Sequence, residues 1–326
     1  MSGTLKDKVF DSAAKPKASR LSFGEELAVL GAQNSEVVAL DADLSKSTQT
    51  AIFGEKFPDR FFNMGIAEAN MISTAAGLAM SGKIPFAASF GCFLTGRFDQ
   101  IRMSVSFSGA NVRLVGTHAG VMIGEDGHSQ MALEDLSLMR TLPNMTVFQP
   151  GDDGDTRDFM RWSLKHVGPC YLRLTRQNLP VIKQRATFAP GRWTELMSLP
   201  REGGVVILAS GGTLEPAVEA AQVLQTSGVT DVCVVNANWI QPFDEEFLLK
   251  LGNAKPKLVV TVEDHSTTGG LGSLVAEFSA DQRLHLPLLR LGVTEFGQSG
   301  SPQANAENYG FTGAKIAERV RRDLAQ

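Results

Sequence analysis

A single carboxylate stands inside an otherwise uncharged, mostly apolar segment. Glu68 lies within residues 65–79, where the other side chains are small, apolar or at most weakly polar. A helix that is apolar on all sides is usually buried in a core or an interface. A carboxyl buried there has a raised pKa and can hand a proton to a ligand. The simpler interpretation is a first-turn glutamate that the helix dipole favours and that stays partly hydrated.

A long glycine-rich segment follows the expected strand at 112–117. Residues 116–130 hold four glycines, two histidines and two acids, among them His118 and Asp126. In open α/β sheets, ligands bind at the carboxyl ends of parallel strands, and long loops in compact domains are usually functional. The segment therefore predicts a ligand site, with an ordinary surface loop as the alternative.

Arg176 comes just after another expected strand, at 170–174. An arginine there can grip a phosphate with two parallel hydrogen bonds. Taken alone, a surface arginine paired with an acid is the simpler interpretation. Phe90, Phe93 and Phe98 follow the strand expected at 85–89, and their spacing favours a core position over a ring-stacking platform.

No residue pattern predicts a metal site in this chain. The five histidines form no ligand cluster by spacing. The acidic stretch at 151–155 lacks the ligand order of an EF-hand, and Asp155 is expected to cap the following helix.

Alternating strands and helices must position these residues. The length of 326 residues suggests about two domains. The alternation predicts an α/β fold of two domains, each with a parallel or mostly parallel sheet flanked by helices. We expect an N-terminal arm at 1–17, loose or lying on a partner, a first domain at 18–182, a linker at 183–202 and a second domain at 203–326. Strands are expected at 37–40, 60–64, 85–89, 112–117, 145–149, 170–174, 205–209, 232–236, 258–263 and 288–291, and helices at 22–32, 66–79, 94–107, 156–166, 216–227, 271–278 and 312–324.

Composition narrows the function classes. Hydrophobic residues make up 43% and charged residues 20% of the chain, which is typical of globular proteins. A net charge of −4 gives no bulk attraction to nucleic acid or to anionic lipid. Three well-separated cysteines argue against a disulfide scaffold. With no apolar run of about 20 residues and no signal-peptide core, we expect a cytoplasmic protein.

The order of these motifs is similar to that of the transketolase family. The resemblance rests on residues 64–68, 89–102, 117–127 and 176–180, and it runs from about residue 18 to residue 319. It implies a pyrimidine-binding domain followed by a transketolase C-terminal domain. Residues 129–135 resemble the animal-type variant, in which Gln130 replaces a histidine that contacts substrate in other members.

A full transketolase has about twice this length. Its additional N-terminal domain holds the cofactor diphosphate and its Mg²⁺ or Ca²⁺ through a Gly-Asp-Gly motif and a downstream asparagine, and no such pair occurs here. The resemblance therefore implies the C-terminal subunit of a split transketolase. Its partner is an N-terminal subunit, the two form an α2β2 heterotetramer, and the apolar Glu68 helix lies at an interface.

The resemblance also implies roles for individual residues. Glu68 and His118 are the expected catalytic residues, and the Glu68 carboxyl hydrogen-bonds the aminopyrimidine ring of thiamine diphosphate and so activates the cofactor. Phe90, Phe93 and Asp43 lie near that cofactor, with Phe93 as the stacking partner. The expected substrate-binding residues are Arg20, Ser47, His118, Asp126, Gln130 and Arg176, of which Arg20, Ser47, His118 and Arg176 bind the phosphate and Asp126 a sugar hydroxyl.

The implied reaction is transfer of a two-carbon ketol unit from a ketose phosphate to an aldose phosphate. Three alternatives stay open: the beta subunit of a thiamine-dependent 2-oxo-acid dehydrogenase, half of a deoxyxylulose-phosphate synthase, and a non-catalytic regulatory or scaffold paralogue. Residues 124–127 and 176–180 favour transketolase, and the presence of the full residue set argues against a non-catalytic role. The sequence leaves open whether the substrate anion is phosphate or sulfonate.

Overall fold

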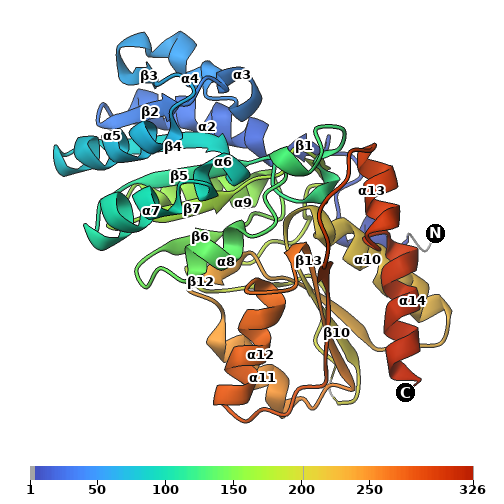
Figure 1. The fold of residues 1–326 in the computed structure, drawn as a ribbon. Coiled ribbons are helices and arrows are strands. Elements are labelled where there is room, and N and C mark those ends of the chain that lie inside the picture. Colours follow the sequence, from blue (N-terminus) through green and yellow to red (C-terminus); the bar gives the residue numbers. More distant parts are fainter. Residues whose placement is uncertain (1–3, 201, 326) are drawn as a thin grey trace.

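A seven-stranded sheet forms the first half of the molecule (Figure 1). The computed structural model describes residues 4–200 and 202–325. Six of the strands run parallel and β12 is antiparallel to its neighbour β6. In sheet order the strands are β12 (Trp239–Gln241), β6 (Thr146–Phe148), β7 (Cys170–Arg173), β5 (Arg113–Thr117), β4 (Ile84–Phe90), β2 (Val37–Asp41) and β3 (Phe61–Asn63).

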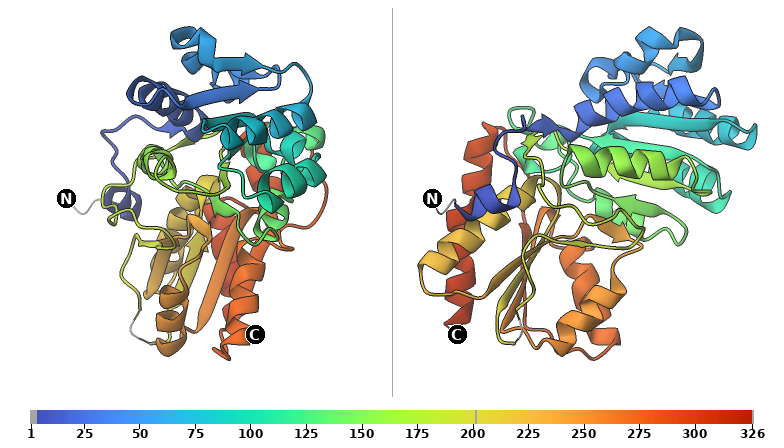
Figure 2. Two further views of the ribbon diagram at one scale, coloured as in Figure 1. Left: turned by 90° about the vertical axis from the view of Figure 1, so that its left-hand side faces the viewer. Right: turned by 180° about the vertical axis from the view of Figure 1, so that it is seen from behind.

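Helices cover both faces of this sheet (Figure 2). On one face α2 (Ser19–Gln33) packs against α9 (Asp153–Ser163), and on the other α5 (Glu68–Met80) packs against η2 (Ile101–Phe107). The single helix expected at 94–107 is instead divided into α6 (Gly91–Thr95), α7 (Phe98–Gln100) and the π-helical η2. The break falls at Gly96 and Arg97, because Arg97 leaves helical geometry at φ −122° and ψ 37°.

A five-stranded sheet forms the second half. Helices α10 (Leu214–Thr226) and α14 (Gly313–Leu324) lie on one side of it, and α11 (Glu245–Asn253) and α12 (Leu271–Asp281) on the other (Figure 1). The parallel strands with helices on both faces confirm the expected α/β class. In sheet order the strands are β14 (Leu288–Val293), β13 (Leu258–Ser266), β10 (Val205–Ala209), β11 (Val232–Asn236) and β9 (Thr194–Glu195), the last being antiparallel.

Short elements complete the chain. A two-stranded ribbon pairs β1 (Lys17–Ala18) with β8 (Asn178–Leu179). Among the described residues, no helix is both long and apolar enough to cross a membrane. The remaining turns and helices are α1 (Leu5–Val9), α3 (Ser45–Thr48), α4 (Ala51–Lys56), η1 (Pro58–Arg60), η3 (Val121–Ile123), η4 (His128–Gln130), α8 (Asp135–Arg140), η5 (Gly211–Thr213) and α13 (Pro302–Asn308).

The sequence pattern did not predict strands β9 and β12, of which β12 joins the two halves. β9 lies in the stretch expected to be a linker, and β12 returns from the second half of the chain to the edge of the first sheet. The Trp239 ring of β12 is 1% exposed and meets the Phe148 ring edge-on at 4.9 Å between centroids. Burial of large aromatic rings of this kind fixes the two halves against each other.

Asp155 was expected to cap α9, and that expectation is wrong. Asp152 is the cap, since its carboxylate accepts a hydrogen bond from the Asp155 amide at 2.7 Å. The Asp155 carboxylate is buried and accepts hydrogen bonds from the Asn236 and Asn238 side chains at 2.7 and 3.0 Å. It therefore joins the two halves, which satisfies a buried charge that would otherwise be costly.

The expected arm is not loose over residues 4–17. Helix α1 is capped by Thr4 and lies against α10, where Lys6 pairs with glutamates of that helix. Val9 and Phe10 are buried, and Phe10 bridges to Ile182. These apolar side chains pack on the chain itself, which the lysine-rich composition of the arm did not reveal. Residues 1–3 of the expected arm lie outside the described residues.

Candidate functional site

The predicted substrate-binding residues line one polar cavity of about 580 Å³. It lies at the carboxyl ends of the parallel strands of the first sheet, where ligands bind in such folds. Phe90 ends β4, His118 follows β5, and Arg176 follows β7. The complete lining is Arg20, Lys46, Ser47, Gln49, Phe90, His118, Asp126, Gln130 and Arg176.

Two arginines give this cavity its charge. Arg20 donates to the Ser47 carbonyl oxygen at 2.7 Å, and Arg176 donates to the Ile123 carbonyl oxygen at 2.9 Å and to Asp126 at 3.3 Å. Burial lowers the pKa of Arg20, and the nearby Arg176 cation lowers it further. Arginine nevertheless stays charged at physiological pH. Two cations held close together are stabilised by an anion between them.

His118 lines the cavity and is buried. Its ring stacks on Phe90 with 3.7 Å between centroids, and its Nδ1 lies 2.9 Å from the Thr117 hydroxyl oxygen. Burial, with the charges of Arg20 and Arg176, lowers its pKa to about 3. The imidazole is therefore neutral at physiological pH and acts as a hydrogen-bonding group, adding no positive charge of its own.

Phe93 offers an aromatic face beside this cavity. The Phe90 ring stacks on His118, and the Phe90 and Phe93 rings are nearly parallel, 5.4 Å apart with 7° between their planes. Phe93 is only half-buried, so part of its ring is free for a flat ring to stack on.

Glu68 is the first residue of α5 and is 6% exposed. Within the part of the chain that the structure describes, no group donates a hydrogen bond to its carboxyl. Helix α5 contacts α6, which carries Phe93. Glu68 is thus a largely buried residue whose carboxyl is free to bind a ligand, and it lies next to an element with a half-buried aromatic face. Together they fit the polar and flat aminopyrimidine ring of thiamine diphosphate.

Asp43 does not join the polar cavity. It is exposed, has a left-handed φ of 64°, and accepts a hydrogen bond from Asn63 at 3.3 Å. The neighbouring Asp41 is buried and accepts from the Thr48 and Thr50 hydroxyls at 2.6 and 2.9 Å. Burial raises the pKa of Asp41. The hydrogen bonds of Asp41 fix the turn that carries Ser47.

Sequence reasoning missed three residues of this region: Asp41, Lys46 and Gln49. Lys46 adds a cation to the cavity lining, and Gln49 donates to the Lys46 carbonyl oxygen. A usable signal was present, since Lys46 precedes the predicted Ser47 directly. Across the described residues, no group of three histidine, cysteine or acidic side chains is placed to hold a metal ion.

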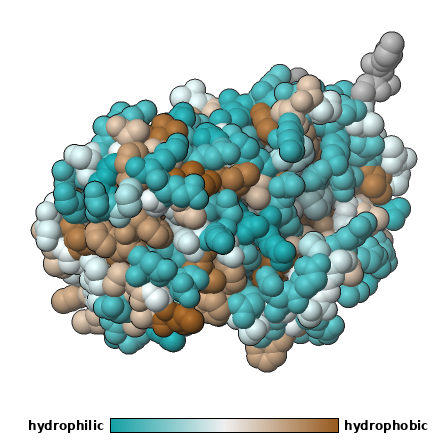
Figure 3. Space-filling model, turned by 90° about the horizontal axis from the view of Figure 1, so that it is seen from above, coloured by the Kyte–Doolittle hydropathy of each residue, from teal (hydrophilic) through white to brown (hydrophobic). Residues whose placement is uncertain are grey.

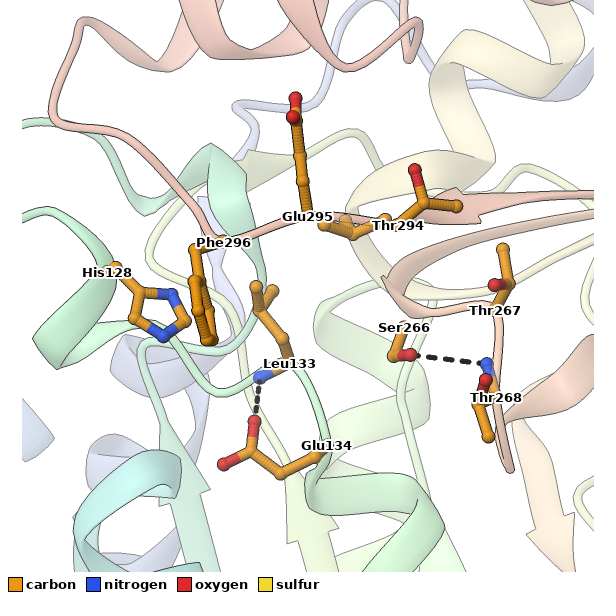
Figure 4. Close-up of a pocket in the computed structure, with 10 residues that line it drawn as sticks. His128, Leu133, Glu134, Ser266, Thr267, Thr268, Thr294, Glu295 and Phe296 are labelled. Atoms are coloured by element: carbon orange, nitrogen blue, oxygen red, sulfur yellow. Dashed lines mark hydrogen bonds between the residues drawn. The ribbon is translucent and has the colours of Figure 1, made fainter.

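A second cavity of about 640 Å³ lies between the two halves (Figure 4). The rings of His128 and Phe296 lie on one side of it, 4.5 Å apart, and the hydroxyl residues 266–268 on the other. The His128 Nδ1 accepts from the Gly297 amide at 3.1 Å. None of the predicted site residues lines this cavity, which contains no arginine or lysine, so the polar cavity is the better candidate.

Two family models match the chain. Residues 15–181 match the pyrimidine binding domain of transketolase, and residues 198–316 match the transketolase C-terminal domain. The chain belongs to the transketolase family. The family depends on thiamine diphosphate.

Similar proteins occur both as separate chains and as halves of longer ones. The chain is 42% identical to a Methanocaldococcus jannaschii protein provisionally named a transketolase C-terminal section, over 94% of this chain and 96% of that protein. It is 40% identical to the 6-deoxy-6-sulfo-D-fructose transketolase subunit SqwH of a Clostridium strain, over 87% of both. It is 35% identical to human transketolase over 93% of its own length but spans only 48% of that protein.

A solved structure agrees with this placement. A split-gene transketolase described as an inactive beta4 tetramer superposes with a TM-score of 0.83, at 40% identity, over 95% of this chain and 99% of that one. The transketolase of Campylobacter jejuni, at 23% identity, shares the fold with a TM-score of 0.80 and is covered over 49% of its length. The chain therefore corresponds to the C-terminal half of transketolase.

Proposed function

We propose that this chain is the C-terminal subunit of a two-chain, cytoplasmic transketolase. Joined to an N-terminal subunit, it moves a two-carbon ketol unit from a ketose phosphate to an aldose phosphate. The observation that carries the proposal is the convergence of Arg20, Ser47, His118, Asp126 and Arg176 on one cavity.

At the cofactor end, Glu68 and Phe93 are the residues that hold thiamine diphosphate. When bound, this cofactor supplies the carbanion chemistry that breaks and forms carbon–carbon bonds. The Glu68 carboxyl hydrogen-bonds a ring nitrogen of the aminopyrimidine and holds a proton there, while Phe93 stacks on the ring. The partner subunit holds the diphosphate and its Mg²⁺ or Ca²⁺.

At the substrate end, the chain binds an anion and orients hydroxyl groups. Arg20 and Arg176 bind the phosphate, with hydrogen bonds from Ser47 and the neutral His118. The Asp126 carboxylate accepts a hydrogen bond from a sugar hydroxyl, and Gln130 contacts the substrate through its amide. Fixing both ends of the sugar aligns the reacting carbons, which is the main contribution of positioning to catalysis.

Exposed apolar side chains support an obligate assembly. Ile66 is 84% exposed, Met80 66% and Phe107 82%, and they flank or belong to α5 and η2. Apolar side chains also lie among polar ones on the face seen from above in Figure 3. Exposed apolar surface of this kind marks interaction sites. We place the N-terminal subunit and a second copy there, in an α2β2 heterotetramer; the inactivity of the beta4 relative supports the need for a partner.

We propose that the anion is a phosphate. The three cations Arg20, Lys46 and Arg176 outnumber the one carboxylate of the lining, Asp126, and this positive excess suits a phosphate dianion better than a sulfonate monoanion. The Clostridium relative is named for a sulfonated sugar, so both anions belong in the assay.

The test is reconstitution. The chain is co-expressed with an N-terminal chain that carries a Gly-Asp-Gly motif, and transfer from a ketose phosphate to an aldose phosphate is followed by product analysis. We expect transfer by the complex and none by either chain alone. Decarboxylation of a 2-oxo acid, consumption of pyruvate, or cofactor binding without turnover would instead identify one of the three alternatives.

A further inference from the structure

The loop that carries half of the anion site has little regular structure of its own. Residues 118–130, which follow β5, supply His118, Asp126 and Gln130 and contain only two single turns, η3 and η4. Yet Val121, Met122 and Ile123 of η3 are all buried. A short turn of this kind leaves backbone groups that need partners from elsewhere in the fold.

Those partners come from the second half of the chain. The Asp264 carboxylate, on β13, accepts from the Val121 amide at 2.7 Å and from the Met122 amide at 3.3 Å. Asp264 is 4% exposed, and its carbonyl oxygen accepts from the buried Arg173 of the first sheet at 2.9 Å. Arg173 in turn pairs with Asp135 at 2.9 Å. The buried Arg173 thus fixes the backbone of Asp264, while the Asp264 carboxylate binds the turn.

Asn305 grips the same turn at another point. Its side-chain amide, 1% exposed on α13, donates to the Val121 carbonyl oxygen at 2.9 Å and to the Gln298 carbonyl oxygen at 3.1 Å. Gly120 makes the close approach feasible: it has φ 92°, and a Cβ there would lie 2.0 Å from an Asp264 carboxylate oxygen. Only glycine fits both the conformation and the space.

The clamped turn leads directly to the anion site. The Ile123 carbonyl oxygen, at the end of η3, accepts from Arg176 at 2.9 Å, and Asp126 accepts from the same guanidinium at 3.3 Å. Neither Asp264 nor Asn305 lines the polar cavity. A shift of the turn would therefore move Arg176 and Asp126 without removing any group that touches the substrate.

We propose that Asp264 and Asn305 are positioning residues, and that the C-terminal half of this chain clamps the substrate loop so that Arg176 and Asp126 meet the substrate. The inference rests on the proposed function, because the clamp acts on the same anion site. It gives the second half a role in substrate affinity although none of its residues lines the polar cavity.

The test uses Asp264→Asn and Asn305→Ala, with Asp281→Asn as the control because Asp281 is exposed at the end of α12. Amide hydrogen exchange measures the stability of the clamped turn and does not depend on catalytic activity. In Asp264→Asn at least one of the Val121 and Met122 amides exchanges about tenfold faster, since the two amides bond different carboxylate oxygens and asparagine keeps only one oxygen acceptor. The Ala119 amide, which donates to the Leu174 carbonyl oxygen at 3.3 Å, serves as an internal reference and keeps its rate.

Kinetics of the reconstituted complex provides the second readout. Both variants raise the KM for the ketose phosphate about tenfold and keep kcat within about threefold. They raise the KM for the unphosphorylated ketose by no more than about threefold, because that sugar uses Asp126 but not Arg176; Asp281→Asn matches wild type. Simple loss of folded protein would lower the apparent kcat for both sugars alike and leave KM unchanged. Unchanged exchange at the two amides, or equal effects on the two sugars, overturns the clamp.

A failure of the proposed function gives a different pattern. If the wild-type complex transfers no ketol unit, the proposed function fails. Amide hydrogen exchange and calorimetric titration with inorganic phosphate then still test whether the clamp exists. Weaker phosphate binding by both variants supports it, and unchanged binding contradicts it. If the wild-type complex is active while both variants keep wild-type exchange and KM, the function stands and the clamp is wrong.

Discussion

Replacing Arg176 with alanine removes one of the two arginines of the anion site. Its guanidinium is anchored by the Ile123 carbonyl oxygen at 2.9 Å and reaches Asp126 at 3.3 Å. In the proposed function, its remaining N–H groups bind the phosphate, to which arginine commonly makes two parallel hydrogen bonds. Arg20 and Lys46 stay behind and keep the cavity cationic.

The size of the effect follows from burial and from the remaining charges. A hydrogen bond to a charged group contributes about 1.5–3 kcal/mol. The Arg176 side chain is 38% exposed, so solvent screens it, and its removal also relieves the repulsion that acts on Arg20. We therefore expect a net loss of about 2 kcal/mol in the binding free energy of the substrate phosphate. Since about 1.4 kcal/mol corresponds to a factor of ten, the KM for a ketose phosphate should rise about 30-fold.

The assay is steady-state ketol transfer by the reconstituted complex, with a ketose phosphate and the same ketose without its phosphate. The expected result is a 30-fold higher KM for the phosphate ester, with kcat within about threefold and little change for the unphosphorylated sugar. Arg322→Ala, on the exposed end of α14, is the matched control. A change in KM below about threefold, or an equal change for both sugars, would refute the assignment of Arg176 to the anion site.

Three further predictions test neighbouring parts of the site. Phe93→Ala should raise about tenfold the thiamine diphosphate concentration that gives half-maximal activity, because a stacked ring contributes about 0.5–1.5 kcal/mol beyond its buried area. An unchanged concentration would exclude stacking on Phe93. Gly120→Ala should lower the free energy of unfolding by about 3 kcal/mol, because of its positive φ and the clash with Asp264. Gly228→Ala, at φ 97° but with open space around it, should lower it by only about 1 kcal/mol. Equal losses would contradict the close approach at Gly120. The folded pKa of His118, about 3, lies below its ordinary value of 6.5, so the unfolded chain binds more protons and stability falls as pH drops from about 6.5 toward 3; NMR should show no imidazole titration between about pH 5 and 8, and a midpoint above pH 5 would contradict this environment.

Much of the fold follows from local sequence pattern. The buried strands β2, β4, β5, β10 and β11 are short apolar runs bounded by polar residues, and such runs predict parallel strands without help from the rest of the chain. Phe90 ends β4 and His118 follows β5, so parallel topology brings these two site residues to the carboxyl edge of the first sheet. Arg20 on α2, Ser47 on α3 and the loop residues Asp126 and Gln130 line the same cavity from outside the strands.

What the sequence did not predict depends on distant contacts. β12 has three residues, and nothing local shows that it pairs with β6 of the other sheet. Helix α1 is stabilised by α10, more than two hundred residues away. The lysines of α1 obscure the apolar pattern that would have predicted its burial. The glycine-rich loop was identified, but its conformation is set by Asp264 and Asn305, which no local pattern connects to it.

The most direct test of the central claim is the turnover of Glu68→Gln in the reconstituted complex. Glutamine keeps the size of the side chain but cannot hold the proton at the cofactor ring. Because a positioned proton-transfer group contributes about 10²–10⁴-fold, the account predicts a fall in kcat of at least about a hundredfold, with the KM for the sugar phosphate little changed. Glu318→Gln, exposed on α14, should match wild type. A Glu68→Gln complex that turns over within about threefold of wild type would contradict the account.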